Sequence, residues 1–187
     1  MLRKPTFKLV KAESVAFGKK YAISEQALRK LCSRFPRNTN ASEVMLKALV
    51  LNKLYSTRVN DKDVEPLARH IAGLNIDTLL GKGSFDAVDL IADCPDLDRE
   101  YSFATKFCAL HNPAAYPIYD RNADECLWAY RKQDRFAKFF RKDLRDYPVW
   151  VNTVREFRAY YKLSHVSFRQ LDKFLWSEGA RILQGSR

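Results

Sequence analysis

A chain of 187 residues is long enough to bury a hydrophobic core of its own. Hydrophobic residues make up 47% and charged residues 29%, and no apolar run reaches the roughly 18 residues that span a bilayer, so we expect a cytoplasmic protein with no membrane partner. The formal net charge of +11 is uneven, because residues 1–60 hold 13 Lys and Arg against 3 Asp and Glu, residues 61–100 hold 4 against 10, and residues 101–187 hold 16 against 9. Such segregation favours a basic surface that meets phosphates.

The N-terminal segment differs in pattern from the rest of the chain. Phe7 and Leu9, then Val15 and Phe17, alternate briefly with polar residues. This alternation predicts an N-terminal arm or a short strand over residues 1–20.

From residue 21 onward the apolar residues recur at helical spacing, and Ser, Asn, Asp, Gly and Pro residues mark the helix ends. The expected helices before residue 100 begin at Ser24, Asn40, Asn60 or Asp61, Asp77 and Ser84. Those after it run from Ser102 to Leu110, from Asp120 toward Phe140, from about Pro148 to Tyr161, and from Ser167 to Gly179, the last with a Ser167–Gln170 capping box. The sequence therefore predicts an all-α globule of seven to nine helices. It would form a single domain over 21–187, with the helices of 145–187 packing back on it.

The four cysteines exclude two common kinds of site. Cys32, Cys94, Cys108 and Cys126 are far apart and irregularly spaced, unlike the ligands of a zinc site or the bridges of a secreted scaffold. We expect reduced, packed thiols, no metal and no cofactor.

The most informative stretch of the sequence is the run SFATKFCALHNPAAYPIYDRN, which covers Ser102 to Asn122. An apolar helix ends before Pro113, and Pro117 restricts the chain just before Asp120. Asp120 then precedes a second helix, so that its carboxylate lies beside a helix N-terminus. Local sequence explains Asp120 equally well as an ordinary N-cap or as a functional carboxylate.

The same stretch resembles the helix-hairpin-helix DNA glycosylase superfamily, and most of all the MutY-type adenine glycosylases. In that group an S-x-A run precedes F-P-I-L-D-G-N, and here Ser102 and Ala104 precede a matching run that ends with Asp120 and Asn122. The separation between the serine and the aspartate matches without a gap. The run SEVML, which includes Glu43, also matches the run that carries the catalytic glutamate of these enzymes. Glu43 is more readily explained as the third helical residue of a capping box with Asn40.

The resemblance implies a protein that binds duplex DNA and acts on a flipped base, without an iron-sulfur cluster, because the clustered cysteines of many relatives are absent. Asp120 would stabilise a developing sugar cation and Glu43 would protonate the departing base. Lyase members have a lysine at the position of Ser102, so a serine there implies a monofunctional hydrolase. The implied substrate-binding residues are Ser102, Lys106, Tyr55, Tyr119 and Asn122.

One segment departs from the family pattern. The glycine-rich turn that grips a phosphate in these enzymes is replaced by residues 93–101, which contain no glycine and four acids. Other cations would then have to contact DNA, and the candidates are Arg99, Arg121, Arg131, Lys132, Arg135 and Lys138.

This departure leaves alternatives open. The main alternative to a glycosylase-like enzyme is a non-catalytic nucleic-acid-binding protein that keeps the fold, and a third is a helical protein that binds a partner through its acidic residues 86–100. If the source is bacterial, a DNA-binding role implies association with the nucleoid.

Overall fold

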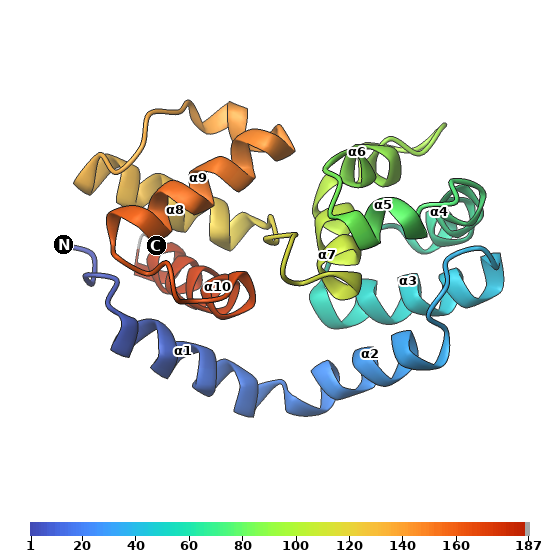
Figure 1. The fold of residues 1–187 in the computed structure, drawn as a ribbon, viewed down its shortest axis with the longest axis horizontal. Helices are drawn as coiled ribbons and strands as arrows, with labels where there is room; N and C mark the ends of the chain where they lie inside the picture. Colours follow the sequence, from blue (N-terminus) through green and yellow to red (C-terminus); the bar gives the residue numbers. More distant parts are fainter. Residues whose placement is uncertain (186–187) are drawn as a thin grey trace. The chain divides into compact units, whose positions relative to one another are not determined.

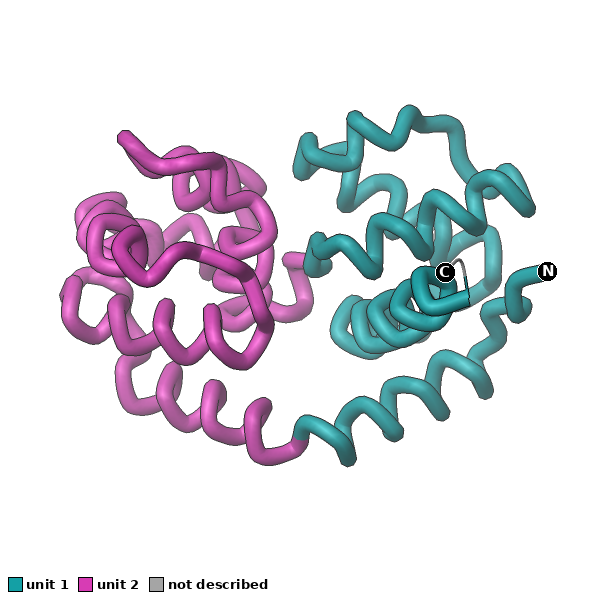
Figure 2. The backbone as a smooth tube through the Cα atoms, turned by 180° about the vertical axis from the view of Figure 1, so that it is seen from behind, with its two compact units in different colours: residues 1–21, 117–187 teal, residues 22–116 magenta. Residues whose placement is uncertain are grey.

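The computed structural model describes residues 1–185, and these form ten α-helices and one 3-10 helix, with no strand (Figure 1). The all-α prediction is confirmed, although the described chain contains more helices than the seven to nine expected. Two compact units divide the chain: unit 1 is Met1–Tyr21 with Pro117–Arg187, and unit 2 is Ala22–Tyr116 (Figure 2). The sequence predicted one domain over 21–187.

Unit 2 is built from six consecutive helices. They are α2 (Ala22–Arg34), α3 (Ala41–Tyr55), α4 (Asp61–Gly73), α5 (Asp77–Lys82), α6 (Asp86–Ala92) and α7 (Tyr101–His111). Helix α7 is central, because it packs against α2, α3, α5 and α6, and eight of its eleven residues are buried. Asn40 caps α3 as predicted, since its side chain accepts from the N–H groups of Ser42 and Glu43. Gly83 ends α5 in the left-handed conformation, at φ 68°.

Unit 1 combines the N-terminal helix with the C-terminal helices. They are α1 (Phe7–Lys20), α8 (Arg121–Asp134), the 3-10 helix η1 (Arg141–Arg145), α9 (Tyr147–Tyr160) and α10 (Phe168–Gly185). Helix α10 packs against both α8 and α1. Tyr130 of α8 meets Phe157 and Tyr161 edge to face, and Phe136 meets Phe157 in the same way.

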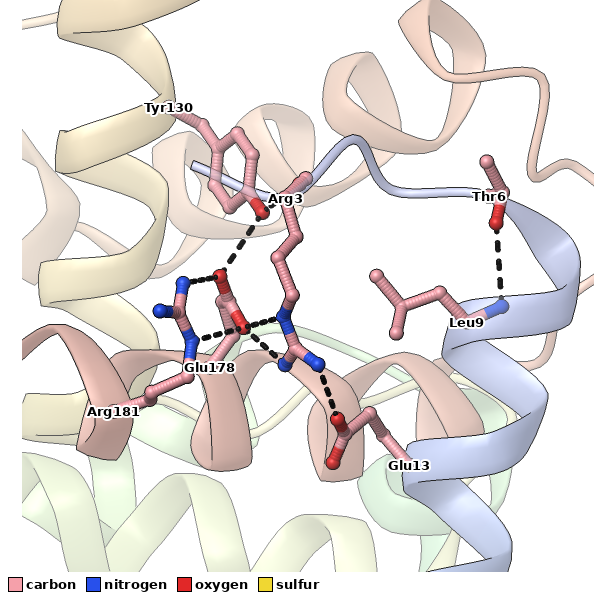
Figure 3. A network of polar contacts seen from close by, with 7 residues as sticks. All are labelled: Arg3, Thr6, Leu9, Glu13, Tyr130, Glu178 and Arg181. Atoms are coloured by element: carbon pink, nitrogen blue, oxygen red, sulfur yellow. Dashed lines mark hydrogen bonds and ion pairs between the residues drawn. The ribbon is translucent and has the colours of Figure 1, made fainter. Parts of the chain in front are cut away.

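The predicted arm or strand at the N-terminus is instead helix α1, and the strand alternative is wrong. The side chain of Thr6 caps α1 by accepting from the N–H of Leu9 at 3.2 Å. Arg3, just before the cap, lies over α10, where its Nε donates to the Glu178 carboxylate at 2.9 Å (Figure 3). The sequence pattern does not indicate this helix, because only Val10 of α1 is fully buried. A helix with so few buried residues has almost no apolar stripe at the helical spacing of 3.6 residues.

Two helix ends also differ from prediction. Helix α8 stops at Asp134, because Arg135 turns left-handed at φ 51° and lets Phe136 and Phe139 fold back toward the core. Helix α10 continues past Gly179 to Gly185, so Gly179 lies inside the helix rather than ending it. The capping box at the start of α10 is confirmed: the Ser167 N–H donates to Gln170 Oε1 at 3.0 Å, and the Gln170 N–H donates to Ser167 Oγ at 3.2 Å.

Candidate functional site

The segment that leads into Asp120 is held in place by bonds to its backbone. Pro117 is buried, and its carbonyl oxygen accepts from the Tyr147 hydroxyl at 3.1 Å and from the Trp150 indole N–H at 3.3 Å. Ile118 is also buried, and its N–H donates to Oδ1 of Asp172 at 3.2 Å. Helices α9 and α10 therefore fix the two residues that set the direction of the chain into Asp120.

Asp120 is the N-cap of α8, as predicted. Its backbone is extended, at φ −152° and ψ 172°, and its Oδ1 accepts from the Ala123 N–H at 2.8 Å. The residue is partly exposed, and Oδ2 makes no hydrogen bond with residues 1–185. The helix N-terminus favours negative charge there. Asp120 therefore presents a fixed carboxylate with one oxygen available to a ligand.

Asp172 lies beside this site and was not anticipated from the sequence. It is in α10, it is only 6% exposed, and burial raises its pKa to about 8. Arg169 and the Ile118 N–H oppose this shift, whereas the negative charge of Asp120 adds to it. No local signal marks Asp172, because an aspartate on an amphipathic helix normally lies on the solvent face.

The other two predicted residues near Asp120 face different surroundings. The Tyr119 ring is 7% exposed and meets Trp150 edge-on at 5.1 Å, and its hydroxyl donates to Asp124 at 2.8 Å. Tyr119 would have to leave these contacts to stack on a base. Asn122 is partly exposed in the first turn of α8.

Three of the predicted substrate-binding residues lie together in unit 2. Lys106 is 5% exposed, and its ammonium group donates to the Ser102 Oγ at 3.1 Å and to the Tyr55 carbonyl oxygen at 3.3 Å. The two side chains are one turn apart on α7, as their spacing predicts. Lys106 therefore joins the end of α3 to the start of α7.

Glu43 also belongs to unit 2, in the first turn of α3, and it is partly exposed. Of the predicted capping box, the bond from the Glu43 N–H to Asn40 Oδ1 is present at 3.3 Å. The second bond of the box, from the Asn40 N–H to the Glu43 carboxylate, is absent among residues 1–185, so the cap does not occupy this carboxylate.

Lys47, four residues after Glu43, is fully buried, and it donates to the carbonyl oxygens of Phe35 and Arg37 and to Asn38 Oδ1. Lys47 thus anchors the chain before α3.

The predicted DNA-binding cations have different environments. Exposed side chains are those of Arg121, Lys132, Arg135 and Lys138. The Arg131 guanidinium lies over the rings of Trp128 and Phe139, at 4.9 Å and 5.6 Å. Arg99 is paired with Asp89 and Asp93, so its charge is already compensated within unit 2.

The net charge belongs to one unit. Unit 1 holds 21 Lys and Arg against 10 Asp and Glu, whereas unit 2 holds 12 of each. The formal excess of +11 is therefore confined to the unit that carries Asp120. This distribution favours unit 1 as the part of the chain that meets phosphates.

The family model HI_0787_N, described as an N-terminal domain, matches residues 8–115. This match covers more than half of the chain. The chain belongs to the HI_0787_N N-terminal domain family. The matched range of the HI_0787_N domain includes Glu43, Tyr55, Ser102 and Lys106, and it ends two residues before unit 1 resumes at Pro117.

One relative of this HI_0787_N family member comes from Haemophilus influenzae and is named only as an uncharacterized protein. It is 33% identical over 140 residues, which are 73% of this chain and 66% of the relative, so the chain spans just under two thirds of that protein. No solved structure matches the chain. Within residues 1–185, no helix is long and apolar enough to cross a bilayer, and no three His, Cys, Asp or Glu side chains gather as metal ligands would.

Proposed function

We propose that this protein binds DNA through unit 1 and hydrolyses the N-glycosidic bond of a damaged, mismatched or modified base, with Asp120 as the essential carboxylate. The observation that carries the proposal is the fixed position of Asp120 at the start of α8, with one carboxylate oxygen free of hydrogen bonds to residues 1–185. The sequence resemblance to helix-hairpin-helix glycosylases supports it. The excess positive charge of unit 1 supports it as well.

The chemistry follows from the sugar. As the bond to the base breaks, the sugar becomes cation-like, and a carboxylate beside it lowers the energy of that state. Water then adds to the sugar carbon, while the base leaves with a proton. A serine at position 102 cannot form the Schiff base of a lyase, so we expect hydrolysis alone.

Replacing Asp120 by Asn tests the catalytic part of the proposal. Asn caps helices about as well as Asp, so α8 should stay intact while the negative charge is lost. We expect Asp120→Asn to retain DNA binding and to lose base release by about a hundredfold or more, the scale seen when one electrostatic group is removed from an active site. The measurement is base release from duplexes that carry damaged, mismatched or modified bases.

Asp146→Asn is the matched control. Asp146 caps α9 in the same unit by accepting from the Val149 N–H at 3.0 Å, and it is exposed. We expect this variant to keep full base release. Unchanged release by Asp120→Asn, or no release by the wild-type protein from any duplex of the panel, would falsify the catalytic proposal.

The DNA-binding part has its own test, in the salt dependence of binding. Lys132, Arg135 and Lys138 are exposed near the end of α8, and their triple replacement by Gln should reduce the slope of log K against log salt by up to about 2.7, at about 0.9 for each phosphate contact. The control is the triple replacement of Lys53, Lys62 and Lys82 by Gln, which removes the same charge from exposed positions of unit 2. Equal slopes for the two triple variants would exclude this part of unit 1 as the DNA contact.

A second function is favoured by one observation. Arg99, the cation nearest the expected phosphate-binding turn, is compensated by Asp89 and Asp93. This leaves that turn without a free positive charge and favours a non-catalytic nucleic-acid-binding protein. Such a protein would show the salt dependence described above and no base release.

A further inference from the structure

Phe140, in the segment between α8 and η1, is the most exposed aromatic residue that the structure describes, at 69%. Its ring contacts neither another aromatic ring nor a cation within the described part of the chain. The neighbouring Phe139 is only 7% exposed, and its ring meets Trp128 of α8 at 6.2 Å. The backbone at Phe140 is extended, at φ −94° and ψ 145°, so successive side chains point to opposite sides. Phe139 therefore faces the core, and Phe140 faces solvent.

The residue that follows the exposed ring anchors this segment to α8. Arg141 donates from Nε to Asp124 and from Nη2 to Glu125, both at 2.7 Å. Asp124 also accepts from the Tyr119 hydroxyl at 2.8 Å. The first turns of α8 and the residue before Asp120 thus hold the start of η1. The exposed ring is displayed from a fixed segment at the end of α8 where Asp120 lies.

Positive charges flank the ring on both sides. Lys138 precedes it by two residues, on the same side of the extended chain, and Lys142 and Arg145 follow it in η1. All three are exposed, and none forms an ion pair with residues 1–185. Residues 135–146 hold five Lys and Arg against two Asp. Of these two, Asp143 accepts from the Phe140 N–H at 3.2 Å, and Asp146 caps α9.

A flat apolar ring between cations suits a polyanion that carries flat apolar groups. Nucleic acid has this chemistry, because its bases stack on aromatic side chains while its phosphates attract Lys and Arg. An anionic membrane surface also attracts cations, but its grip on a protein grows with the apolar area that enters it. A single phenylalanine offers little such area, whereas one ring is enough to stack on one base. The surroundings of Phe140 therefore favour nucleic acid over a membrane.

We propose that Phe140 stacks on an unpaired base of DNA, while Lys138, Lys142 and Arg145 contact the phosphates beside it. This inference rests on the DNA-binding part of the proposed function and does not depend on base release. Stacking requires a base that has left its own stack, and a mispaired base leaves at lower cost than a paired one. Phe140 would then make the protein prefer DNA with a mispaired site.

The test compares the dissociation constants for a duplex with a central two-base mismatch and for the same duplex fully paired, at one salt concentration. The wild-type protein should bind the mismatched duplex more tightly by about fivefold or more, the scale of one base stacked on an aromatic ring. Phe140→Ala should lose this preference. Phe140→Trp should keep it, because indole also stacks, and Phe140→Leu should lose most of it, because leucine is apolar but not flat. Since the ring is exposed, these variants should fold, which circular dichroism checks.

Two control variants separate stacking from other effects. Phe7→Ala removes another exposed phenylalanine of unit 1, but the Phe7 ring already meets His165 at 4.6 Å, so this variant should keep the preference. Lys142→Gln/Arg145→Gln should weaken binding to both duplexes alike. It should also reduce the slope of log K against log salt by about 1.8, at about 0.9 for each phosphate contact.

The outcomes separate this inference from the proposed function. A mismatch preference that is unchanged in Phe140→Ala, or fully kept in Phe140→Leu, would overturn the stacking role and leave DNA binding intact. Binding to phosphatidylserine vesicles that is lost in Phe140→Ala, with an unchanged mismatch preference, would assign the ring to a membrane surface instead. A preference that depends on Phe140 without base release would reject the glycosylase function alone. A wild-type protein that binds neither duplex would overturn both.

Discussion

Replacing Gly179 by Ala is expected to destabilise the protein by about 3 kcal/mol, because it inserts a methyl group where two helices touch. A Cβ at position 179 would lie 1.9 Å from the backbone oxygen of Asn122 and 2.5 Å from its carbonyl carbon. No rotamer change relieves a clash with backbone, so α10 and α8 must move apart. Asn122 is two residues after Asp120, so we also expect reduced base release at temperatures where the variant is folded. Urea unfolding followed by circular dichroism measures the loss.

Gly18→Ala is the matched control for this prediction. Gly18 lies inside α1, and a Cβ there meets only Lys173 Nζ, at 3.7 Å. Ala is favoured over Gly within a helix by about 1 kcal/mol, so this variant should be at least as stable as the wild type. If Gly179→Ala were as stable as the wild type, α8 and α10 could not approach each other at Gly179 as closely as the structure shows.

Removing both arginines that bind Glu178 is expected to cost about 3–5 kcal/mol, more than removing Glu178 itself. The Glu178 side chain is fully buried, and it accepts from Arg3 Nε at 2.9 Å and from Arg181 Nε at 3.1 Å (Figure 3). In Arg3→Ala/Arg181→Ala the buried carboxylate loses both of the cations that compensate its charge. In Glu178→Gln the two guanidinium groups, which are 39% and 48% exposed, can turn toward solvent. We expect Glu178→Gln to cost about 1–2 kcal/mol.

The free energy of unfolding should depend differently on pH in Arg3→Ala/Arg181→Ala, which keeps the Glu178 carboxyl, and in Glu178→Gln, which lacks it. Burial alone would raise the pKa of Glu178, but the hydrogen bonds from Arg181 and Arg3 outweigh it and lower the pKa. In the wild type this contribution is present above about pH 4.3, the ordinary pKa of Glu, and is lost as the pH falls through the lower native pKa. In the double variant the pKa is raised, so its deficit relative to the wild type should shrink between pH 7 and pH 5.

Arg69→Ala is the control for the loss of an ion pair. Arg69 and Glu65 form an exposed pair on α4, with side chains 71% and 55% exposed, and its loss should change stability by less than about 1 kcal/mol. A double variant that is no less stable than Glu178→Gln would contradict the structural role of the arginines.

The sequence predicted the elements whose signals are local. Asn40 before α3, the Ser167–Gln170 capping box before α10 and Asp120 before α8 were all recognised, because a capping side chain acts within three residues of its own position. The spacing of Ser102 and Lys106 also placed them correctly on one face of α7.

Signals that depend on distant residues were misread. The sequence pattern predicts a helix end at Gly179, whereas this glycine lies inside α10 and allows the close approach of Asn122, which is 57 positions earlier. Asp172 and Lys47 were unremarkable in the sequence, yet one is buried against Ile118 and the other against the chain before α3.

The sequence by itself thus determined the all-α class, most helix starts and Asp120 as the residue of interest, since propensity, capping and hydrophobic period are properties of neighbouring residues. Only the tertiary structure decided which charges are exposed and which are compensated, that the excess positive charge lies in the unit of Asp120, and that Asp172 is buried beside it. These features depend on burial and on pairs of residues far apart in the chain, and burial is set when the helices pack.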